Sequence, residues 1–433
     1  MNNLNDILLA MDFGTSNSLV GMVSREQQKI TLPIDPFAKD NSILRSLVYF
    51  SDENTSFYGA EAIKEYIQND FEGRLFRSFK SHLPNPNYLG TLIGKNRRLP
   101  LEELVGIFIL QMKKRVETNL QTQVDSVVLG RPARYSMNPI EDELAVFRMR
   151  KAAEFAGFKN IHFVPEPLAA AFNYRKSLTK ERIVLIGDFG GGTSDFTIIR
   201  IGPFNFKKSD VLAIEGCPLA GDALDSLFMS QHFNNYFGAN VQYQIPMSSN
   251  LLRMPPVILD RLNKPAHIVH LKESATFEFL REIKKVAVSQ KDKDTVERLL
   301  CLVEDNQIFS FFEEIEKTKR TLSSEGSAEF KYSYPGIEIK ENVSRKNFEM
   351  WAEDFKDKVF SAMDRALVDA QLHPEAIDLI CLTGGTAFVP IINDEFAKRF
   401  GKEKLNTTSH FHSVQSGLVE AASLILQGVD IAM

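Results

Sequence analysis

The amino-acid sequence predicts an α/β protein made of two related halves. Along the chain, apolar runs of strand length alternate with segments whose apolar residues recur at helical spacing. One hairpin pattern occurs twice, first at residues 7–23 (ILLAMDFGTSNSLVGMV) and again at residues 183–199 (IVLIGDFGGGTSDFTII). The 433 residues are enough for two or more folded units. A duplicated hairpin in such a chain predicts two half-domains that close on one ligand.

Each copy of the hairpin consists of an apolar run, Asp-Phe-Gly, a turn of small residues with Thr-Ser, and a second apolar run. A glycine-rich turn lets backbone N–H groups approach an anion closely. Asp12 and Asp188 stand where the first strand of each copy ends, and Asp195 follows the second turn. An aspartate beside a glycine turn is often only a turn residue, but its repetition favours a function. Carboxylates bind Mg²⁺, so the pattern predicts an ATP site with a divalent cation.

The segments around the hairpins predict the other elements in order. We expect a helix at LEELVGIFILQMKKRVETNL, a strand in VDSVVLGRPARYS, a helix in ELAVFRMRKAAEFAGF that closes near Gly157, and a strand, turn and helix in IHFVPEPLAAAFNY. After the second hairpin, LAGDALDSLFMSQHF predicts a helix, AIDLICLTGGTAFVPIINDEFAKRF a strand, a Gly-Gly turn and a helix, and VQSGLVEAASLILQ a closing helix. Residues 231–340 are the least regular region, with one clear helix at FSFFEEIEKTKRTLSS.

The bulk composition narrows the classes of partner. The net charge of −5 gives no reason to expect nucleic acid or an anionic membrane. No apolar run approaches the roughly 20 residues of a membrane span, and the N-terminus reads as a first strand instead of a signal peptide. Cys217, Cys301 and Cys381 are odd in number and are expected as small core residues of a cytoplasmic protein.

Two further groups of residues have alternative interpretations. Gly384-Gly385-Thr386 follows an apolar run and precedes a helix, where a base or sugar could pack on the backbone, or where the turn is a plain loop. Glu316, Lys319 and Arg320 share one face of a predicted helix. That face is either a solvated set of ion pairs or a surface that hydrogen-bonds a ribose and base.

Five motifs in order resemble the actin-like ATPase superfamily, and within it the nucleotide-binding domain of DnaK-type seventy-kilodalton heat-shock chaperones. They are MDFGTSNS, VPEPLAAAFNY, GDFGGGTSDF, EKTKRTLSS and LTGGTAFVP. The resemblance covers essentially the whole chain and extends to short stand-alone homologues of the YegD type. It implies a two-lobed α/β fold of duplicated ribonuclease-H-like domains with a nucleotide cleft between them.

The same resemblance assigns a role to individual residues. Asp12, Asp188 and Asp195 would surround Mg²⁺, mostly through its waters, and Pro132 would relay the nucleotide state. Lys80, in LFRSFKSHLP, would orient the attacking water, and Glu166 would accept a hydrogen bond from that water or from a water on Mg²⁺. The phosphates would lie against Gly14, Thr15, Ser16, Gly191, Gly192 and Thr193, and the catalytic set would be Lys80, Glu166, Asp188 and Thr193. The residues that would hold adenosine are Gly221, Glu316, Lys319, Arg320, Gly384, Gly385, Thr386 and Phe388.

The sequence also departs from the family. Phe388 stands where the family has an arginine stacked on adenine, so affinity or base preference is expected to differ. The family's Asn-Pro-Asp-Glu segment before the last helix is replaced by SHFHSV, and residues 231–310 are longer than the corresponding subdomain. We expect no acidic linker and no β-rich peptide-binding domain.

The predicted domain organisation follows the duplication. Lobe I would be 1–182, with its core at about 1–40 and 120–182, an inserted subdomain at about 41–119, and the C-terminal helix 405–433 returning to it. Lobe II would be 183–404, with its core at about 183–230 and 340–404 and an inserted subdomain at about 231–339.

The favoured function is slow Mg²⁺-dependent ATP hydrolysis coupled to lobe closure, with a protein client or co-chaperone as partner. Three alternatives stay open at this point. They are a non-hydrolysing nucleotide-gated scaffold, suggested by the missing peptide domain, a sugar kinase of the same superfamily, and a filament-forming protein like the actins.

Overall fold

A computed structural model describes residues 7–88, 90–94, 97–175, 178–203, 207–247, 249–264, 271, 273–406, 413–429 and 431. The chain forms two compact units. The first contains Met1–Gly221 and Asp357–Met433, and the second contains Asp222–Lys356. This division does not follow the predicted lobes, because both repeated hairpins fall in the first unit. The lobe boundaries therefore stay a prediction.

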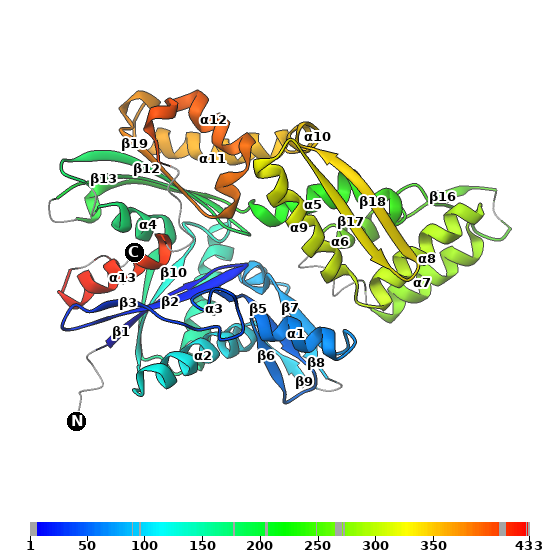
Figure 1. The fold of residues 1–433 in the computed structure, drawn as a ribbon, viewed down its shortest axis with the longest axis horizontal. Coiled ribbons are helices and arrows are strands. Elements are labelled where there is room, and N and C mark those ends of the chain that lie inside the picture. The colour runs from blue at the N-terminus through cyan, green and yellow to red at the C-terminus, as the bar shows by residue number, and fades with distance from the viewer. Residues whose placement is uncertain are drawn as a thin grey trace. The chain divides into compact units, whose positions relative to one another are not determined.

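The first unit contains two mixed sheets of the same topology (Figure 1). One has the order β11-β10-β1-β2-β3, and the other, read in the matching direction, has the order β20-β19-β12-β13-β14. In each sheet the repeated hairpin is antiparallel, and its first strand pairs in parallel with the strand on its other side. The predicted duplication and the α/β fold class are therefore confirmed.

The strands of the first sheet are β1 (Ile7–Phe13), β2 (Asn17–Ser24), β3 (Lys29–Thr31), β10 (Ser126–Arg131) and β11 (Asn160–Pro165), with β4 (Leu44–Arg45) paired to β2. Those of the second sheet are β12 (Arg182–Phe189), β13 (Ser194–Ile201), β14 (Val211–Cys217), β19 (Leu379–Thr383) and β20 (Leu405–Asn406).

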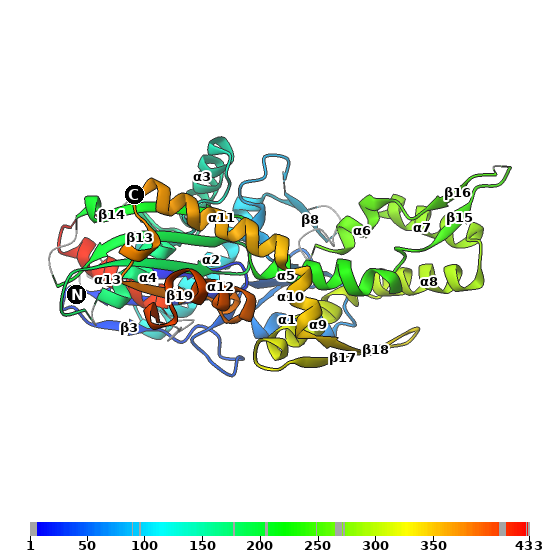
Figure 2. The ribbon, with the colours of Figure 1, turned by 90° about the horizontal axis from the view of Figure 1, so that it is seen from above.

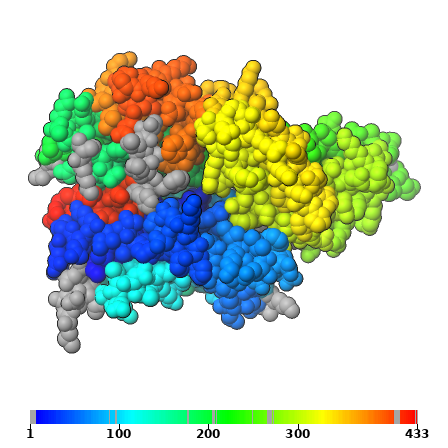
Figure 3. Space-filling model, in the orientation of Figure 1, coloured from blue at the N-terminus to red at the C-terminus, as the bar shows by residue number. Residues whose placement is uncertain are grey.

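Two helices join the sheets into one unit. α4 (Glu166–Arg175) and α13 (Ser413–Leu426) pack on each other and share one buried apolar cluster with residues of β1, β10, β12 and β13. Their approach is close, since a Cβ added to Gly417 would lie 1.6 Å from the Ala169 carbonyl oxygen. Figure 3 shows the red C-terminal segment against the blue N-terminal strands. This shared core connects β1 and β12, the strands that carry the two repeated turns.

The remaining elements of the first unit complete its outer layers. α2 matches the predicted helix, and α3 packs on it by burying Ala145, Met149 and Ala152. These elements are α1 (Ala60–Gln68), α2 (Leu101–Leu120), α3 (Pro139–Phe155), α11 (Glu353–Asp369), α12 (Pro390–Phe400) and the short strands β5 (Leu47–Phe50), β6 (Ser56–Tyr58), β7 (Arg74–Arg77), β8 (Thr91–Ile93) and β9 (Arg97–Leu99).

The second unit is more regular than the sequence indicated, and the expectation of one clear helix in residues 231–340 is wrong. Figure 2 shows α7 and α8 as neighbouring helices. The elements of the second unit are α5 (Gly221–Phe228), β15 (Gln242–Gln244), β16 (Leu251–Arg253), α6 (Pro256–Leu262), α7 (Ser274–Val286), α8 (Gln290–Glu304), α9 (Ile308–Ser324), β17 (Ser327–Tyr334), β18 (Ile337–Ser344) and α10 (Arg345–Trp351).

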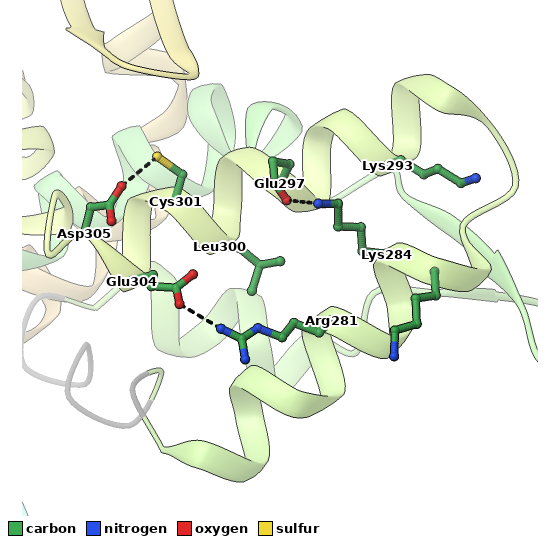
Figure 4. Close-up of a pocket in the computed structure, with 9 residues that line it drawn as sticks. Arg281, Lys284, Lys293, Glu297, Leu300, Cys301, Glu304 and Asp305 are labelled. Atoms are coloured by element: carbon green, nitrogen blue, oxygen red, sulfur yellow. Dashed lines mark hydrogen bonds and ion pairs between the residues drawn. The ribbon is translucent and has the colours of Figure 1, made fainter.

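A cavity of about 620 Å³ lies between α7 and α8 of the second unit (Figure 4). Ion pairs join Arg281 to Glu304 and Lys284 to Glu297 at its walls, so much of its charge is balanced. None of the predicted site residues lines it. Cys301, also at its wall, is only partly buried and donates to Asp305 (3.2 Å), so the prediction of three core cysteines holds for Cys217 and Cys381 alone.

No helix in the described ranges is long and apolar enough to cross a membrane.

Candidate functional site

The two hairpins end in turns with the same backbone geometry. Gly14 N–H donates to the Asn17 carbonyl at 3.0 Å, and Gly190 N–H donates to the Thr193 carbonyl at 3.0 Å. The strand registers also correspond, since Asp12 pairs with Leu19 in the first hairpin and Asp188 pairs with Asp195 in the second. Two acids therefore come from the second hairpin and one from the first.

The two turns lie against each other within the first unit. A Cβ added to Gly192 would lie 3.0 Å from the Thr15 hydroxyl oxygen, closer than side chains normally pack. Gly190, Gly191, Gly192 and Thr193 keep partial or full solvent access at the turn. Accessible small residues of the second turn thus lie against Thr15 of the first, an arrangement in which backbone N–H groups can approach an anion.

Lys80 and Glu166 form an ion pair beside these turns. Lys80 lies in the short helix Phe79–His82, which follows Ser78 in the left-handed region (φ 52°). Its Nζ is 2.8 Å from Glu166 Oε1, at the first residue of α4, and the two residues are only 6% and 8% exposed. The aromatic rings of Phe13 and Tyr135 lie 5.6 and 5.9 Å from the ammonium group. The fold therefore brings together two residues that are 86 positions apart in the chain.

Burial and neighbouring carboxylates raise the pKa values of the three aspartates. Burial, with Glu166 nearby, raises the pKa of Asp12 to about 7, although Lys80 partly opposes the rise. Burial and Glu166 likewise raise the pKa of Asp195 to about 7, and Asp188 has a pKa well above its usual range for the same reasons. For Lys80, burial disfavours the charged form, but Glu166, Tyr135 and Asp12 together outweigh it and raise the pKa. One buried ammonium does not balance this set of carboxylates.

The surroundings of these carboxyl groups are compatible with a divalent cation. The carboxyl groups of Asp12 and Asp188 make no hydrogen bond to another side chain or backbone group in the part of the chain that the structure describes. In those same ranges no three His, Cys, Asp or Glu side chains converge closely enough to hold a metal directly. Carboxylates that lack enough neighbouring positive charge, beside a glycine-rich turn, fit a hydrated cation such as Mg²⁺, which usually keeps several of its waters.

Asp195 is also bound by the loop that follows β10. The backbone N–H of Ala133 donates to Asp195 Oδ1 at 2.9 Å. Hydrogen bonds from the Thr193 side chain and from the backbone of Arg134 and Ala133 favour the charged form of Asp195 and limit the rise of its pKa. Pro132, predicted as a relay, is the buried residue directly before Ala133.

Sequence reasoning missed some residues of this region. Ser46 donates to the Gly14 carbonyl at 2.7 Å and lies 2.9 Å from the Ser18 hydroxyl, which anchors the first turn. Tyr135 is buried near Lys80, and burial raises its pKa to about 12. The position of Tyr135 just past Pro132 was a usable signal, whereas nothing local marks Ser46.

The predicted adenosine loop meets the second phosphate turn. Gly384 has φ 85°, and a Cβ there would lie 2.0 Å from the Phe189 carbonyl oxygen. The Thr386 hydroxyl donates to the Gly190 carbonyl at 3.3 Å, and the Gly221 N–H donates to the same oxygen at 3.2 Å. Gly385 is exposed at this turn. The structure therefore brings Gly221 and the loop beside the turn.

Three further predicted adenosine residues, Glu316, Lys319 and Arg320, lie on helix α9 of the second unit. Lys319 pairs with the buried Asp225 of α5 at 2.6 Å, and Arg320 pairs with Glu316 one turn away. The Arg320–Glu316 pair is partly solvated, as the ion-pair interpretation expects, whereas the Lys319–Asp225 pair is buried. That this face also holds adenosine stays a prediction.

Two mixed sheets of equal topology, each ending in the same phosphate-type turn, define the actin-like ATPase fold. A model of the family described as "Hsp70 protein" matches residues 90–300 and 302–430. The chain belongs to the Hsp70 family.

Curated relatives agree with this family. The chain is 25% identical over 447 residues to "Chaperone protein DnaK" of Thermosipho melanesiensis, covering 100% of this chain and 62% of the relative. It is 25% identical to "Chaperone protein HscA homolog" of Acinetobacter baylyi, over 97% of this chain and 58% of the relative. For the HscA homologue of Rickettsia africae the identity is 26% over 53% of this chain and 38% of the relative. The chain thus spans about three fifths of the DnaK relative.

Proposed function

We propose that this chain binds ATP with Mg²⁺ and hydrolyses it slowly, and that the nucleotide state controls lobe closure and the binding of a protein client or co-chaperone. The observation that carries the proposal is the buried Lys80–Glu166 pair among three aspartates at the ends of the repeated hairpins. Holding a nucleotide requires only the turns and the cation. A buried lysine–glutamate pair is an additional feature that hydrolysis would use.

The phosphates are assigned to the two turns, on Gly14, Thr15, Ser16, Gly191, Gly192 and Thr193. Asp12, Asp188 and Asp195 are assigned to Mg²⁺, mostly through its waters, so the three carboxylates need not converge on the ion itself. When bound, Mg²⁺ supplies positive charge to the phosphate oxygens.

Lys80 and Glu166 are assigned to the attacking water. Lys80 keeps its charge when buried, because Glu166 raises its pKa, and it would offset negative charge that develops on the phosphoryl group. Glu166 would accept a hydrogen bond from the water and so orient it. Asp188 and Thr193 complete the predicted catalytic set.

Adenosine is assigned to Gly221, Gly384, Gly385 and Thr386, with Phe388 on the base and Glu316, Lys319 and Arg320 on the ribose and base. Phe388 is 49% exposed at the end of this loop, which leaves its ring available for stacking. We also propose the placement among YegD-type homologues and the lobe boundary at residues 182–183.

Calorimetric titration with ATP, in Mg²⁺ and in EDTA, together with measured turnover, tests the function. We expect Mg²⁺-dependent binding and slow Mg²⁺-dependent release of phosphate. Inorganic triphosphate should bind more weakly than ATP, because it lacks the adenosine contacts. Failure to bind ATP in Mg²⁺ would overturn the proposal. Binding without any turnover would overturn hydrolysis and leave a nucleotide-gated scaffold.

Replacing Phe388 by alanine should weaken ATP binding about fivefold or more, since stacking on an aromatic ring is worth roughly 1–3 kcal/mol per base. Binding of inorganic triphosphate should not change. Val368→Ala is the matched control, because Val368 is also an exposed apolar residue of the first unit (74% exposed) and belongs to none of the predicted sites. Equal ATP affinity in F388A and wild type would remove Phe388 from the base site.

A further inference from the structure

Arg134 connects the loop after β10 to the second sheet. Its Nη2 lies 2.9 Å from Oε1 of Glu215, a buried residue of β14. The other oxygen of the same carboxylate, Oε2, lies 3.2 Å from Nε of Arg365 on α11. Glu215 therefore holds one arginine with each oxygen, and only one of these arginines belongs to the loop.

The loop that Arg134 carries is the loop that contacts Asp195. Ala133, the preceding residue, donates its N–H to Asp195 Oδ1 at 2.9 Å. On β14, Gly216 pairs with Asp195 and directly follows Glu215. A Cβ added to Gly216 would lie 2.8 Å from Asp195 Oδ1 and 3.3 Å from the Arg134 nitrogen. The loop thus rests on the backbone of β14, and Gly216 leaves the space for it.

Three further hydrogen bonds of the loop stay within residues 131–142, between the end of β10 and the start of α3. Arg131 donates to the loop's own carbonyls of Pro132 and Ala133, at 3.3 and 3.2 Å. Tyr135 N–H donates to Asp142 Oδ1, in the first turn of α3, at 2.6 Å. Among the side-chain contacts of this loop in the described residues, the Arg134–Glu215 pair is the ion pair that joins it to the second sheet.

We propose that Arg134, held by Glu215, is a positioning residue that sets the Ala133 N–H on Asp195 and so orients this carboxylate toward the Mg²⁺–nucleotide complex. The proposal rests on the proposed function. In the described residues the Arg134 side chain pairs with Glu215 and not with the predicted metal-site acids. It acts through the loop backbone, where both Arg134 and Ala133 hydrogen-bond Asp195. Loss of the Arg134–Glu215 pair should weaken the hydrogen bond from Ala133 N–H to Asp195, because a 2.9 Å hydrogen bond is sensitive to small displacements of its donor.

The chain offers a matched pair of variants for the test. Arg134→Ala and Arg365→Ala each remove one of the two arginines from Glu215, and each leaves the other in place. Both side chains are about half exposed (43% and 46%), so the two losses of stability should be similar. Only R134A releases the loop. Arg134→Lys keeps a cation that can reach Glu215, and should restore the loop in part.

The first measurement is amide hydrogen exchange at Ala133 in nucleotide-free protein. We expect exchange to be roughly tenfold faster in R134A than in wild type, and unchanged in R365A. The second is the ratio of ATP affinities in Mg²⁺ and in EDTA, which should fall about fivefold in R134A and recover in R134K, while R365A keeps the wild-type ratio.

The outcomes separate this proposal from the proposed function. If R134A and R365A change exchange and the Mg²⁺ ratio equally, or if neither changes them, the positioning role of Arg134 is overturned. If wild type itself binds no nucleotide, the proposed function fails and the role toward Mg²⁺ fails with it. The exchange comparison would still report whether Arg134 holds the loop.

Discussion

Replacing Lys80 by methionine should slow ATP hydrolysis at least tenfold while nucleotide binding stays largely intact. A tenfold loss corresponds to about 1.4 kcal/mol of barrier. The reason is that the ammonium group, 2.8 Å from Glu166, is the charge assigned to orient water and to offset the phosphoryl group in the transition state. Single-turnover hydrolysis with pre-bound ATP measures this step apart from binding.

The same substitution should also reduce stability, because it leaves Glu166 buried without its partner. Breaking a buried pair in this way typically costs about 3–5 kcal/mol. In K80M/E166Q no charge is left unpaired, so stability should largely return while hydrolysis stays slow. This double variant separates a chemical role from a structural one.

Lys113→Met is the control for burial. Lys113 is 8% exposed, against 6% for Lys80, and donates to the Ala156 and Gly157 carbonyls at 3.1 and 3.0 Å. Its loss should destabilise the protein and leave the turnover of folded enzyme unchanged. Wild-type turnover in K80M, or an equal loss of turnover in K113M, would show that Lys80 has no special part in hydrolysis.

Asp12→Asn should stabilise the nucleotide-free, Mg²⁺-free protein at pH 8. The pKa of Asp12 is about 7 in the folded protein, against 3.8 for an unperturbed aspartate. Between these values the folded state binds more protons than the unfolded state, so the contribution of Asp12 to stability falls as pH rises from about 4 to 7. Asparagine does not lose stability in this way, so D12N should be more stable than wild type at pH 8 by about 4 kcal/mol.

The measurement is thermal or urea unfolding of D12N and wild type at pH 5 and pH 8. The difference between the two proteins should be small at pH 5 and larger at pH 8. Adding Mg²⁺ and ATP should reverse the order, because D12N loses part of the cation site. A D12N protein less stable than wild type at pH 8 without ligands would contradict the charge argument.

Asp35→Asn provides a control of opposite sign. Asp35 is fully buried, but its carboxylate accepts from the backbone N–H groups of Ala60 and Phe37 at 2.9 and 3.1 Å. These hydrogen bonds stabilise the charged carboxylate of Asp35 in the folded state, so D35N should be less stable than wild type at pH 8. The comparison tests environment and not merely the loss of an aspartate.

Sequence patterns predicted well where the structure is local. The two hairpins, the helix at Leu101–Leu120 and the helix opened by Glu166 all depend on short-range spacing and turn residues. The same reasoning failed for α7 and α8, where charged residues hide the apolar stripe. In α7 only Leu280 and Ile283 among the apolar side chains are buried, and this stripe was too narrow to stand out.

The sequence by itself determined the duplicated phosphate turns, the acids at the strand ends and the α/β class, because residues adjacent in the chain build these features. Tertiary structure alone decided that Lys80 meets Glu166, that Ala133 donates to Asp195, and that Glu215 holds both Arg134 and Arg365. Each of these contacts joins segments from distant parts of the chain. Local spacing carries no information on such pairs, since only the packing of the two sheets brings their atoms within hydrogen-bond distance.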